Sequence, residues 1–185
     1  NKIILDVGVG NGKFAKILAP STKRYIGIDI SKEQLERAKI KTKKMNNVRL
    51  LLCSADKIPL SSESVDIVFA SWAFSTIKNI SKLNSSLKEA ERILKKQGKI
   101  YLVENFPRGE FEKIRDYRPD YITHRKNRLN WLKKNKFKQV KIIDTYFKFD
   151  SIKEAQRVLG DIWGEETRKR IKKEIINISP RIRGF

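Results

Sequence analysis

Short apolar runs alternate, over the first half of the chain, with segments in which apolar residues recur every three or four positions. The apolar runs predict buried β-strands, and the helical spacing predicts amphipathic helices. The expected strands are 3–7, 24–30, 48–53, 65–71 and 99–105, and the expected helices are 12–19, 32–44 and 81–96. Strands that alternate with helices predict a parallel sheet covered by helices on both faces.

Helix 81–96 has the clearest apolar stripe, which consists of Leu83, Leu87, Ala90 and Leu94. Gly98 follows as the expected stop signal of this helix. The later part of the chain is less regular, with an expected helix at 121–135, a strand at 140–149 and a helical segment at about 151–176. Residues 178–185 are the candidate last strand, in which Pro180 favours an edge position or a strand start.

The first strand runs directly into three glycines. Asp6 stands near the end of the strand, and Gly8, Gly10 and Gly12 follow it. A strand, a glycine turn and a helix bring the backbone close to a nucleotide-like ligand. A dinucleotide-binding turn requires a glycine three residues after Gly10, where this chain has Lys13. The acid at the strand end favours a ligand that carries positive charge.

The pattern Asp6-x-Gly8-x-Gly10-x-Gly12 resembles motif I of the class I S-adenosylmethionine-dependent methyltransferases. The resemblance continues in Arg24-Tyr-Ile-Gly-Ile-Asp29, an expected strand that also ends in an acid. In the family, such an acid holds the two ribose hydroxyls of the cofactor. An ionised carboxylate can accept two charge-assisted hydrogen bonds, each of about 1.5–3 kcal/mol.

Residues 48–69 resemble the third and fourth motifs of this family, with Asp56 in the place that reads the adenine amino group. The fourth strand opens into residues 70–74, where family members place cofactor and substrate contacts. The segment 58–68 resembles the corresponding segment of one subgroup of the family, methyltransferase type 11, which contains the quinone-biosynthesis methyltransferases. The resemblance implies S-adenosyl-L-methionine as cofactor, bound by Asp6, Gly8, Gly10, Gly12, Asp29, Ile30, Ala55, Asp56 and Ser71. It implies substrate contacts at Trp72, Phe74 and His124.

The resemblance also implies a Rossmann-like, doubly wound α/β fold. Its mostly parallel, seven-stranded sheet would have an antiparallel C-terminal strand with inserted helices before it. Residues 1–185 would form a single class I methyltransferase domain, with a cofactor-binding core at 1–105 and a substrate-side half at 106–185. Family members usually carry helices before motif I, so the start at Asn1 suggests a fragment or a minimal member.

Several of these residues also have an ordinary structural interpretation. The glycines can form a tight turn in any α/β protein, and Asp6 can make only local hydrogen bonds. Asp29 can simply lie near a helix N-terminus, because the capping-box pattern Ser31-x-x-Gln34 follows it. Asp56 can be a solvated loop acid, while Trp72 and Phe74 can be core aromatics.

Methyl transfer from a sulfonium requires the acceptor to be aligned with the methyl group, and proximity supplies several kcal/mol. A base is needed only when the acceptor atom is protonated. His124 is the sole histidine and can act as such a base, although a surface or structural role is the more ordinary interpretation. We therefore assign no catalytic residue.

The charge is unusual, because 42 Lys and Arg residues against 21 Asp and Glu give a formal net charge of +21. Such a charge attracts nucleic acid. However, the basic residues are spread along the chain, and no N-P-P-[YF]-like motif follows the fourth strand. We expect a methyltransferase (EC 2.1.1.-) with a small-molecule acceptor. The alternatives are an RNA or other macromolecule methyltransferase and a non-catalytic, cofactor-binding scaffold.

The cysteine count and the hydropathy of the chain limit which disulfides, metal sites and membrane spans the protein can have. Cys53 is the only cysteine, which excludes an internal disulfide and favours a reducing cytoplasm. One histidine and one cysteine do not make a zinc cluster, so no metal is expected. No apolar run approaches the length of a membrane span.

Overall fold

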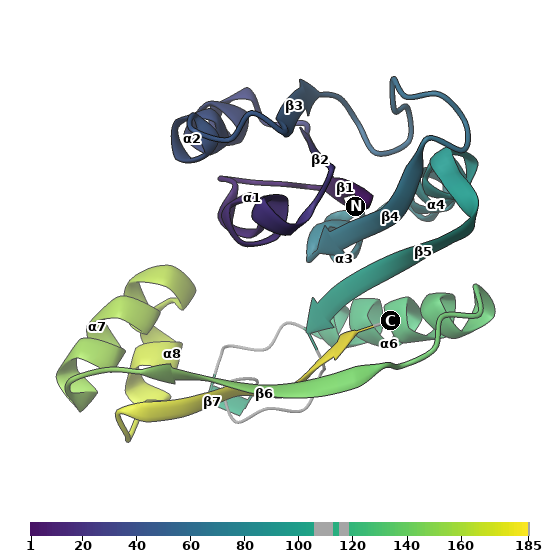
Figure 1. The fold of residues 1–185 in the computed structure, drawn as a ribbon. Coiled ribbons are helices and arrows are strands. Elements are labelled where there is room, and N and C mark those ends of the chain that lie inside the picture. The colour runs from purple at the N-terminus through teal and green to yellow at the C-terminus, as the bar shows by residue number, and fades with distance from the viewer. Residues whose placement is uncertain (106–112, 115–118, 185) are drawn as a thin grey trace. The chain divides into compact units, whose positions relative to one another are not determined.

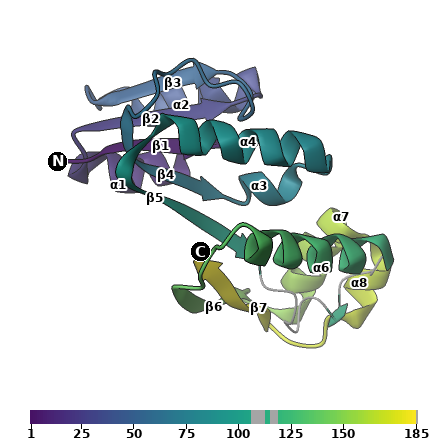
Figure 2. The same ribbon diagram turned by 90° about the vertical axis from the view of Figure 1, so that its right-hand side faces the viewer.

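The computed structural model describes residues 1–105, 113–114 and 119–184 (Figures 1 and 2). The chain divides into two compact units, residues 1–103 and residues 104–185. The roles expected for the two halves of the chain, cofactor binding and substrate recognition, stay predictions.

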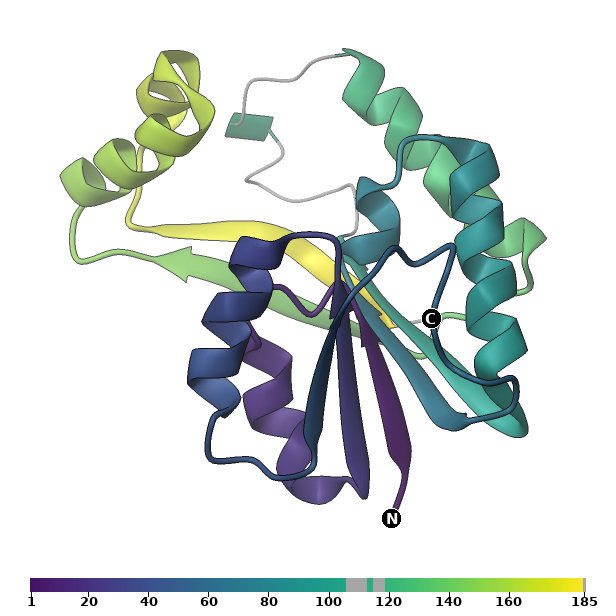
Figure 3. The same cartoon turned by 90° about the horizontal axis from the view of Figure 1, so that it is seen from above.

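The first unit is a parallel sheet with the strand order β3-β2-β1-β4-β5. Its strands are β1 (Ile3–Val7), β2 (Arg24–Asp29), β3 (Val48–Leu52), β4 (Val65–Ser71) and β5 (Leu94–Asn105). Its helices are α1 (Lys13–Leu18), the 3-10 turn η1 (Ala19–Ser21), α2 (Lys32–Thr42), α3 (Ala73–Thr76) and α4 (Ile80–Ile93). Figure 3 shows α1 and α2 on one side of this sheet and α4 on the other.

Burial on both faces explains why these strands are almost uniformly apolar. Leu5, Val68 and Ala70 are completely buried in β1 and β4. The caps of the helices agree with their sequences: the Ser31 hydroxyl accepts from the Gln34 N–H at the start of α2, and the Asn79 side chain accepts from the Lys82 N–H at the start of α4. The expected parallel sheet with helices on both faces is confirmed.

The expected end of the fourth-strand helix is wrong. α4 ends at Ile93, and Leu94 already belongs to β5, where it pairs with Val65. Gly98 therefore lies inside a strand rather than after a helix. A Cβ at Gly98 would lie 2.5 Å from Cγ of Leu94, so this glycine makes room for the Leu94 side chain at an irregularity of the β4–β5 pairing.

The second unit contains α6 (Pro119–Lys134), β6 (Lys141–Lys148), α7 (Ile152–Trp163), α8 (Glu165–Arg170) and β7 (Ile175–Gly184). β6 and β7 pair antiparallel, which confirms the expected antiparallel last strand. β7 begins at Ile175, so the helical segment is shorter than expected and ends at Arg170. The register shifts between the pairs Ile143–Ile182 and Thr145–Ser179. Pro180 lies at this irregularity, where a missing N–H is tolerated.

The second unit has a hydrophobic cluster of its own. Its buried members are Ala155, Leu159, Ile171 and Ile176. Aromatic side chains of β6 and α7, among them Phe147 and Trp163, pack against it. The helices between β6 and β7 are thus part of the packing of this unit. None of the helices within the described ranges is long and apolar enough to cross a membrane.

Candidate functional site

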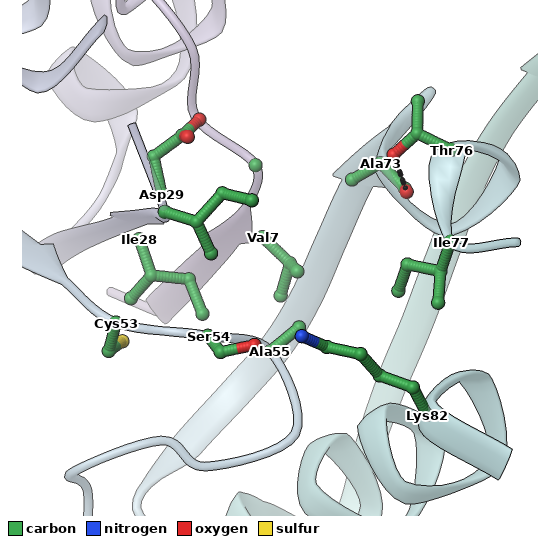
Figure 4. Close-up of a pocket in the computed structure, with 12 residues that line it drawn as sticks. Val7, Ile28, Asp29, Cys53, Ser54, Ala55, Ala73, Thr76, Ile77 and Lys82 are labelled. Atoms are coloured by element: carbon green, nitrogen blue, oxygen red, sulfur yellow. Dashed lines mark hydrogen bonds between the residues drawn. The ribbon is translucent and has the colours of Figure 1, made fainter. Parts of the chain in front are cut away.

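A cavity of about 110 Å³ lies at the carboxyl ends of the first three strands. This is the edge of a parallel α/β sheet at which ligands bind. The lining residues are Val7, Gly8, Ile28, Asp29, Ile30, Cys53, Ser54, Ala55, Ala73, Thr76, Ile77 and Lys82 (Figure 4). Four of the residues expected from the sequence therefore line the cavity: Gly8, Asp29, Ile30 and Ala55.

The three glycines of the turn have different surroundings, although all have a positive φ. A Cβ at Gly8 would lie 2.6 Å from Cβ of Ala73, and one at Gly12 would lie 3.1 Å from Ala38. Gly10 has open space around it. Gly8 and Gly12 thus permit close packing against α3 and α2, whereas Gly10 leaves room beside the backbone for a ligand.

Asp29 is the last residue of β2, and its carboxylate is oriented by two backbone donors. The Gly10 N–H donates to Oδ2 and the Ser31 N–H donates to Oδ1, each over 2.9 Å. A carboxylate offers about four acceptor positions, so two are left for a ligand. Capping of α2 falls to the Ser31 hydroxyl, so Asp29 is not the capping residue.

Asp6 lies behind the turn and is only 1% exposed. The Tyr25 hydroxyl, which is also buried, donates to Oδ2 of Asp6. Burial raises the pKa of Asp6 to about 7, with the Tyr25 hydrogen bond opposing this shift and the nearby Asp29 charge adding to it. Burial and the adjacent Asp6 also raise the pKa of Tyr25. The partner of Asp6 therefore lies on the neighbouring strand β2 rather than in the turn, and its expected role toward the cofactor stays a prediction.

Asp56 lies next to the cavity, in the loop after β3. Its carboxylate accepts a hydrogen bond from the Ser54 hydroxyl, and the Nζ atom of Lys82 lies 3.8 Å from its Oδ1 atom. The Ser54 hydrogen bond, with a smaller contribution from the Lys82 charge, holds the pKa of Asp56 below its usual value. Asp56 is thus a carboxylate at neutral pH, adjacent to the cation of Lys82, which no sequence motif indicates.

Two residues of α4 hold this loop in place. The Arg92 guanidinium donates to the carbonyl oxygens of Ile58 and Leu60, over 3.0 and 2.9 Å. Glu89 accepts from the Ile58 N–H over 3.0 Å and forms an ion pair with Arg92. The Arg92 hydrogen bond lowers the pKa of Glu89 to about 2. This Glu89–Arg92 clamp fixes the loop that carries Ala55 and Asp56.

The last residue of β4, Ser71, and the residues that follow it have different surroundings. Trp72 has a φ of 57° and donates its N–H to the Val103 carbonyl over 2.9 Å, and its side chain is 38% exposed. Phe74 is 1% exposed, in agreement with the core interpretation. The Oγ atom of Ser71 is buried, and among the described residues it has no hydrogen-bond partner.

His124 belongs to α6 by its backbone, and its side chain lies outside the described part of the structure. Its expected substrate contact therefore stays a prediction. Eight lining residues were not expected from the sequence: Val7, Ile28, Cys53, Ser54, Ala73, Thr76, Ile77 and Lys82. Most are neighbours of motif residues at strand ends, which is a signal that the sequence contains, whereas Lys82 on α4 has no such signal. Within the described ranges, no cluster of His, Cys, Asp or Glu side chains could hold a metal ion.

Comparison with known proteins places this geometry in a family. A ubiquinone/menaquinone biosynthesis C-methyltransferase of Rickettsia prowazekii is 34% identical over 125 residues, which are 63% of this chain and 47% of the relative. A phosphoethanolamine N-methyltransferase of Haemonchus contortus, solved with phosphoethanolamine and S-adenosylhomocysteine, matches with 26% identity and a TM-score of 0.55, over 58% of this chain and 23% of that one. The YcgJ protein of Bacillus subtilis shares the fold, with a TM-score of 0.67 at 17% identity over 100% of this chain and 89% of that one.

The chain spans less than half of the length of the curated relatives that it matches. The family match itself extends over residues 5–102, which include the glycine turn, Asp29, the loop after β3 and α4. This match covers more than half of the 185 residues, and the chain therefore belongs to the family described as "Methyltransferase domain".

Proposed function

We propose that this chain is an S-adenosyl-L-methionine-dependent methyltransferase that acts on a small-molecule acceptor. The observation that carries the proposal is the orientation of Asp29 in the cavity by the Gly10 and Ser31 N–H groups. Its two remaining acceptor positions match the two neighbouring hydroxyls of a ribose. Family membership supports the same function.

The lining of the cavity fits the rest of such a cofactor. Gly10 leaves open space at the turn, where a ligand can approach the backbone. Ile30, Ala55 and Ile77 supply apolar walls for a base, next to the polar Asp56 and Lys82. Asp6 does not line the cavity, and its carboxylate accepts a hydrogen bond from the Tyr25 hydroxyl. Its support of the turn is therefore indirect. We propose that Asp29, Ile30 and Ala55 contact the cofactor directly and that Asp6 acts through the position of the turn.

When bound, the cofactor supplies an activated methyl group on a positively charged sulfur. The task of the chain is then to hold the acceptor in line with that group and to keep water away. No side chain of the cavity is needed as a base unless the acceptor atom is protonated. Trp72 follows β4 directly before Ala73, which lines the cavity, and its exposed indole supports a contact with the acceptor.

The choice of a small-molecule acceptor is supported by the similarity to the ubiquinone/menaquinone biosynthesis C-methyltransferase and to the phosphoethanolamine N-methyltransferase. The formal charge of +21 favours a second candidate, in which the acceptor is an RNA. The single cysteine supports a place in a reducing compartment, which we propose is the cytoplasm.

The test combines binding with transfer. In calorimetry, Asp29→Ala should weaken the binding of S-adenosylmethionine by about tenfold or more, the effect of losing about 1.4 kcal/mol. Glu33→Ala, which removes an exposed carboxylate on α2, is the matched control and should leave the affinity unchanged. An unchanged affinity of Asp29→Ala would contradict the cofactor site.

Transfer of a labelled methyl group is then measured with a small-molecule library and with total RNA in parallel. Product in the small-molecule pool supports the proposal, and product only in RNA supports the second candidate. RNA binding that does not weaken with salt would exclude electrostatic recognition. Cofactor binding without product in either pool would favour a scaffold.

A further inference from the structure

Lys82 is the residue of the cavity whose presence the proposed function leaves unexplained. It lies in the first turn of α4, and Figure 4 shows its side chain reaching from the helix toward Ala55. Its Nζ atom lies 3.8 Å from Oδ1 of Asp56, and both side chains are partly exposed. A cation that lines the cavity therefore lies beside an anion that directly follows the lining residue Ala55 in the chain.

Stability does not account for a lysine at this position. A partly exposed ion pair contributes little to stability, and this pair is near the distance limit of such an interaction. A positive charge in the first turn of a helix is also unfavourable, because it faces the positive end of the helix dipole. The cation thus stands where local electrostatics disfavours it, on a residue that lines a cavity.

The chemistry of the pair complements an aminopurine. A lysine ammonium only donates hydrogen bonds, and a carboxylate only accepts them. Adenine presents an exocyclic amine, which donates, directly beside a ring nitrogen that accepts. A neighbouring acceptor and donor on the protein can therefore bind both atoms of the base at once.

We propose that Lys82 recognises the base of the cofactor by donating to a ring nitrogen that flanks the exocyclic amine, while Asp56 accepts from the amine. This inference rests on the proposed function, and Lys82 is its new element. The relative position of the two residues does not depend on their own ion pair, because Glu89 and Arg92 anchor the loop to the same helix. Removal of the ammonium therefore leaves Asp56 in place, which permits a clean test.

The experiment measures, by calorimetry, the binding of S-adenosylhomocysteine and of its 1-deaza and 7-deaza analogues, each of which replaces one flanking nitrogen by carbon. The proteins are the wild type, Lys82→Met and, as a matched control, Lys88→Met, an exposed lysine on the same helix. We expect Lys82→Met to bind S-adenosylhomocysteine about tenfold to 150-fold more weakly than the wild type, the range for a hydrogen bond to a charged group. Lys88→Met should bind as the wild type does.

The decisive result is whether the loss of affinity caused by removing a ring nitrogen differs between the wild type and Lys82→Met. In the wild type, one of the two deaza analogues should bind more weakly than S-adenosylhomocysteine. In Lys82→Met, that analogue and S-adenosylhomocysteine should bind equally. If Lys82→Met keeps wild-type affinity, or if neither analogue couples to Lys82, the inference is wrong.

Failure of the underlying function gives a different result. In that case the wild type itself does not bind S-adenosylhomocysteine, or Asp29→Ala binds it as well as the wild type does. Thermal melting of each variant separates a loss of binding from a loss of folding.

Discussion

Gly8 and Ala73 lie so close together that a Cβ on Gly8 would be 2.6 Å from the Cβ of Ala73. Gly8 lies in the turn after β1 and Ala73 is the first residue of α3 after β4, and both line the cavity. The contact between the glycine turn and α3 therefore shapes this part of the cavity wall. It depends on the absence of a side chain at Gly8.

Gly8→Ala should destabilise the protein and widen the cavity. Overpacking of this kind costs about 1–3 kcal/mol, in addition to the cost of a positive φ. Gly10→Ala is the control, because Gly10 also has a positive φ but has open space around it. Denaturant unfolding should show a larger loss for Gly8→Ala, and equal losses would mean that the contact with Ala73 is unimportant.

The stability of the first unit should depend on pH through Asp6. Its folded-state pKa of about 7 lies above the ordinary value of 3.8, so the protonated acid is the form that folding favours. The stabilisation is complete below about pH 4 and is lost as the pH rises through 7. Compared with Asp6→Asn, which does not titrate, the wild type should lose free energy of unfolding between pH 5 and pH 8. A difference that is constant or grows with pH would contradict the raised pKa.

The Glu89–Arg92 clamp should matter more than the ion pairs on the surface. Arg92→Ala removes donors to Ile58 and Leu60 and should lower the stability by about 1–3 kcal/mol. It should also weaken cofactor binding, because the loop with Asp56 is released. Arg37→Ala, which breaks an exposed pair with Glu33, should change the stability by less than about 0.5 kcal/mol. Urea unfolding and calorimetry measure the two effects, and similar results for both variants would show that the clamp has no special role.

The helices before β7 should be needed for folding of the second unit. Leu159 is 1% exposed in the core of this unit, so Leu159→Ala should cost about 2–5 kcal/mol. Ile162→Ala, on the same helix but 60% exposed, should be nearly neutral. Because the chain has two units, unfolding is followed by fluorescence and by hydrogen exchange, which resolve local transitions. A small effect of Leu159→Ala would mean that α7 is dispensable for packing.

Local patterns in the sequence were sufficient for most of the first unit. β1 and β4 have the expected bounds, because apolar runs between polar segments are unambiguous in a buried parallel sheet. The end of α4 was wrong, because Leu94 continues the helical spacing and Gly98 resembles a cap. Pairing of Leu94 with Val65, a contact between distant segments, decides the structure there.

The candidate site shows the same difference between features that a local sequence pattern indicates and features that depend on contacts between distant segments. Gly8 and Asp29 belong to a motif that can be recognised in a few consecutive residues, and both line the cavity. The expected contact of Asp6 with the cofactor stays a prediction, whereas its hydrogen bond from Tyr25 on the next strand is one that no linear motif reports. Lys82 lies near the loop after β3, which Glu89 and Arg92 anchor to the same helix, α4. Its place in the cavity therefore follows from the folded structure.

The helix α4 performs two tasks on different turns, since Lys82 faces the cavity and Glu89 with Arg92 hold the loop. Recognition and support are thereby separable within one element. On the proposed role of Lys82, a substitution at position 82 should change which base the cavity accepts, while Glu89 and Arg92 keep the loop after β3 in place. This separation makes the first unit a suitable starting point for an engineered enzyme that uses a synthetic methyl donor.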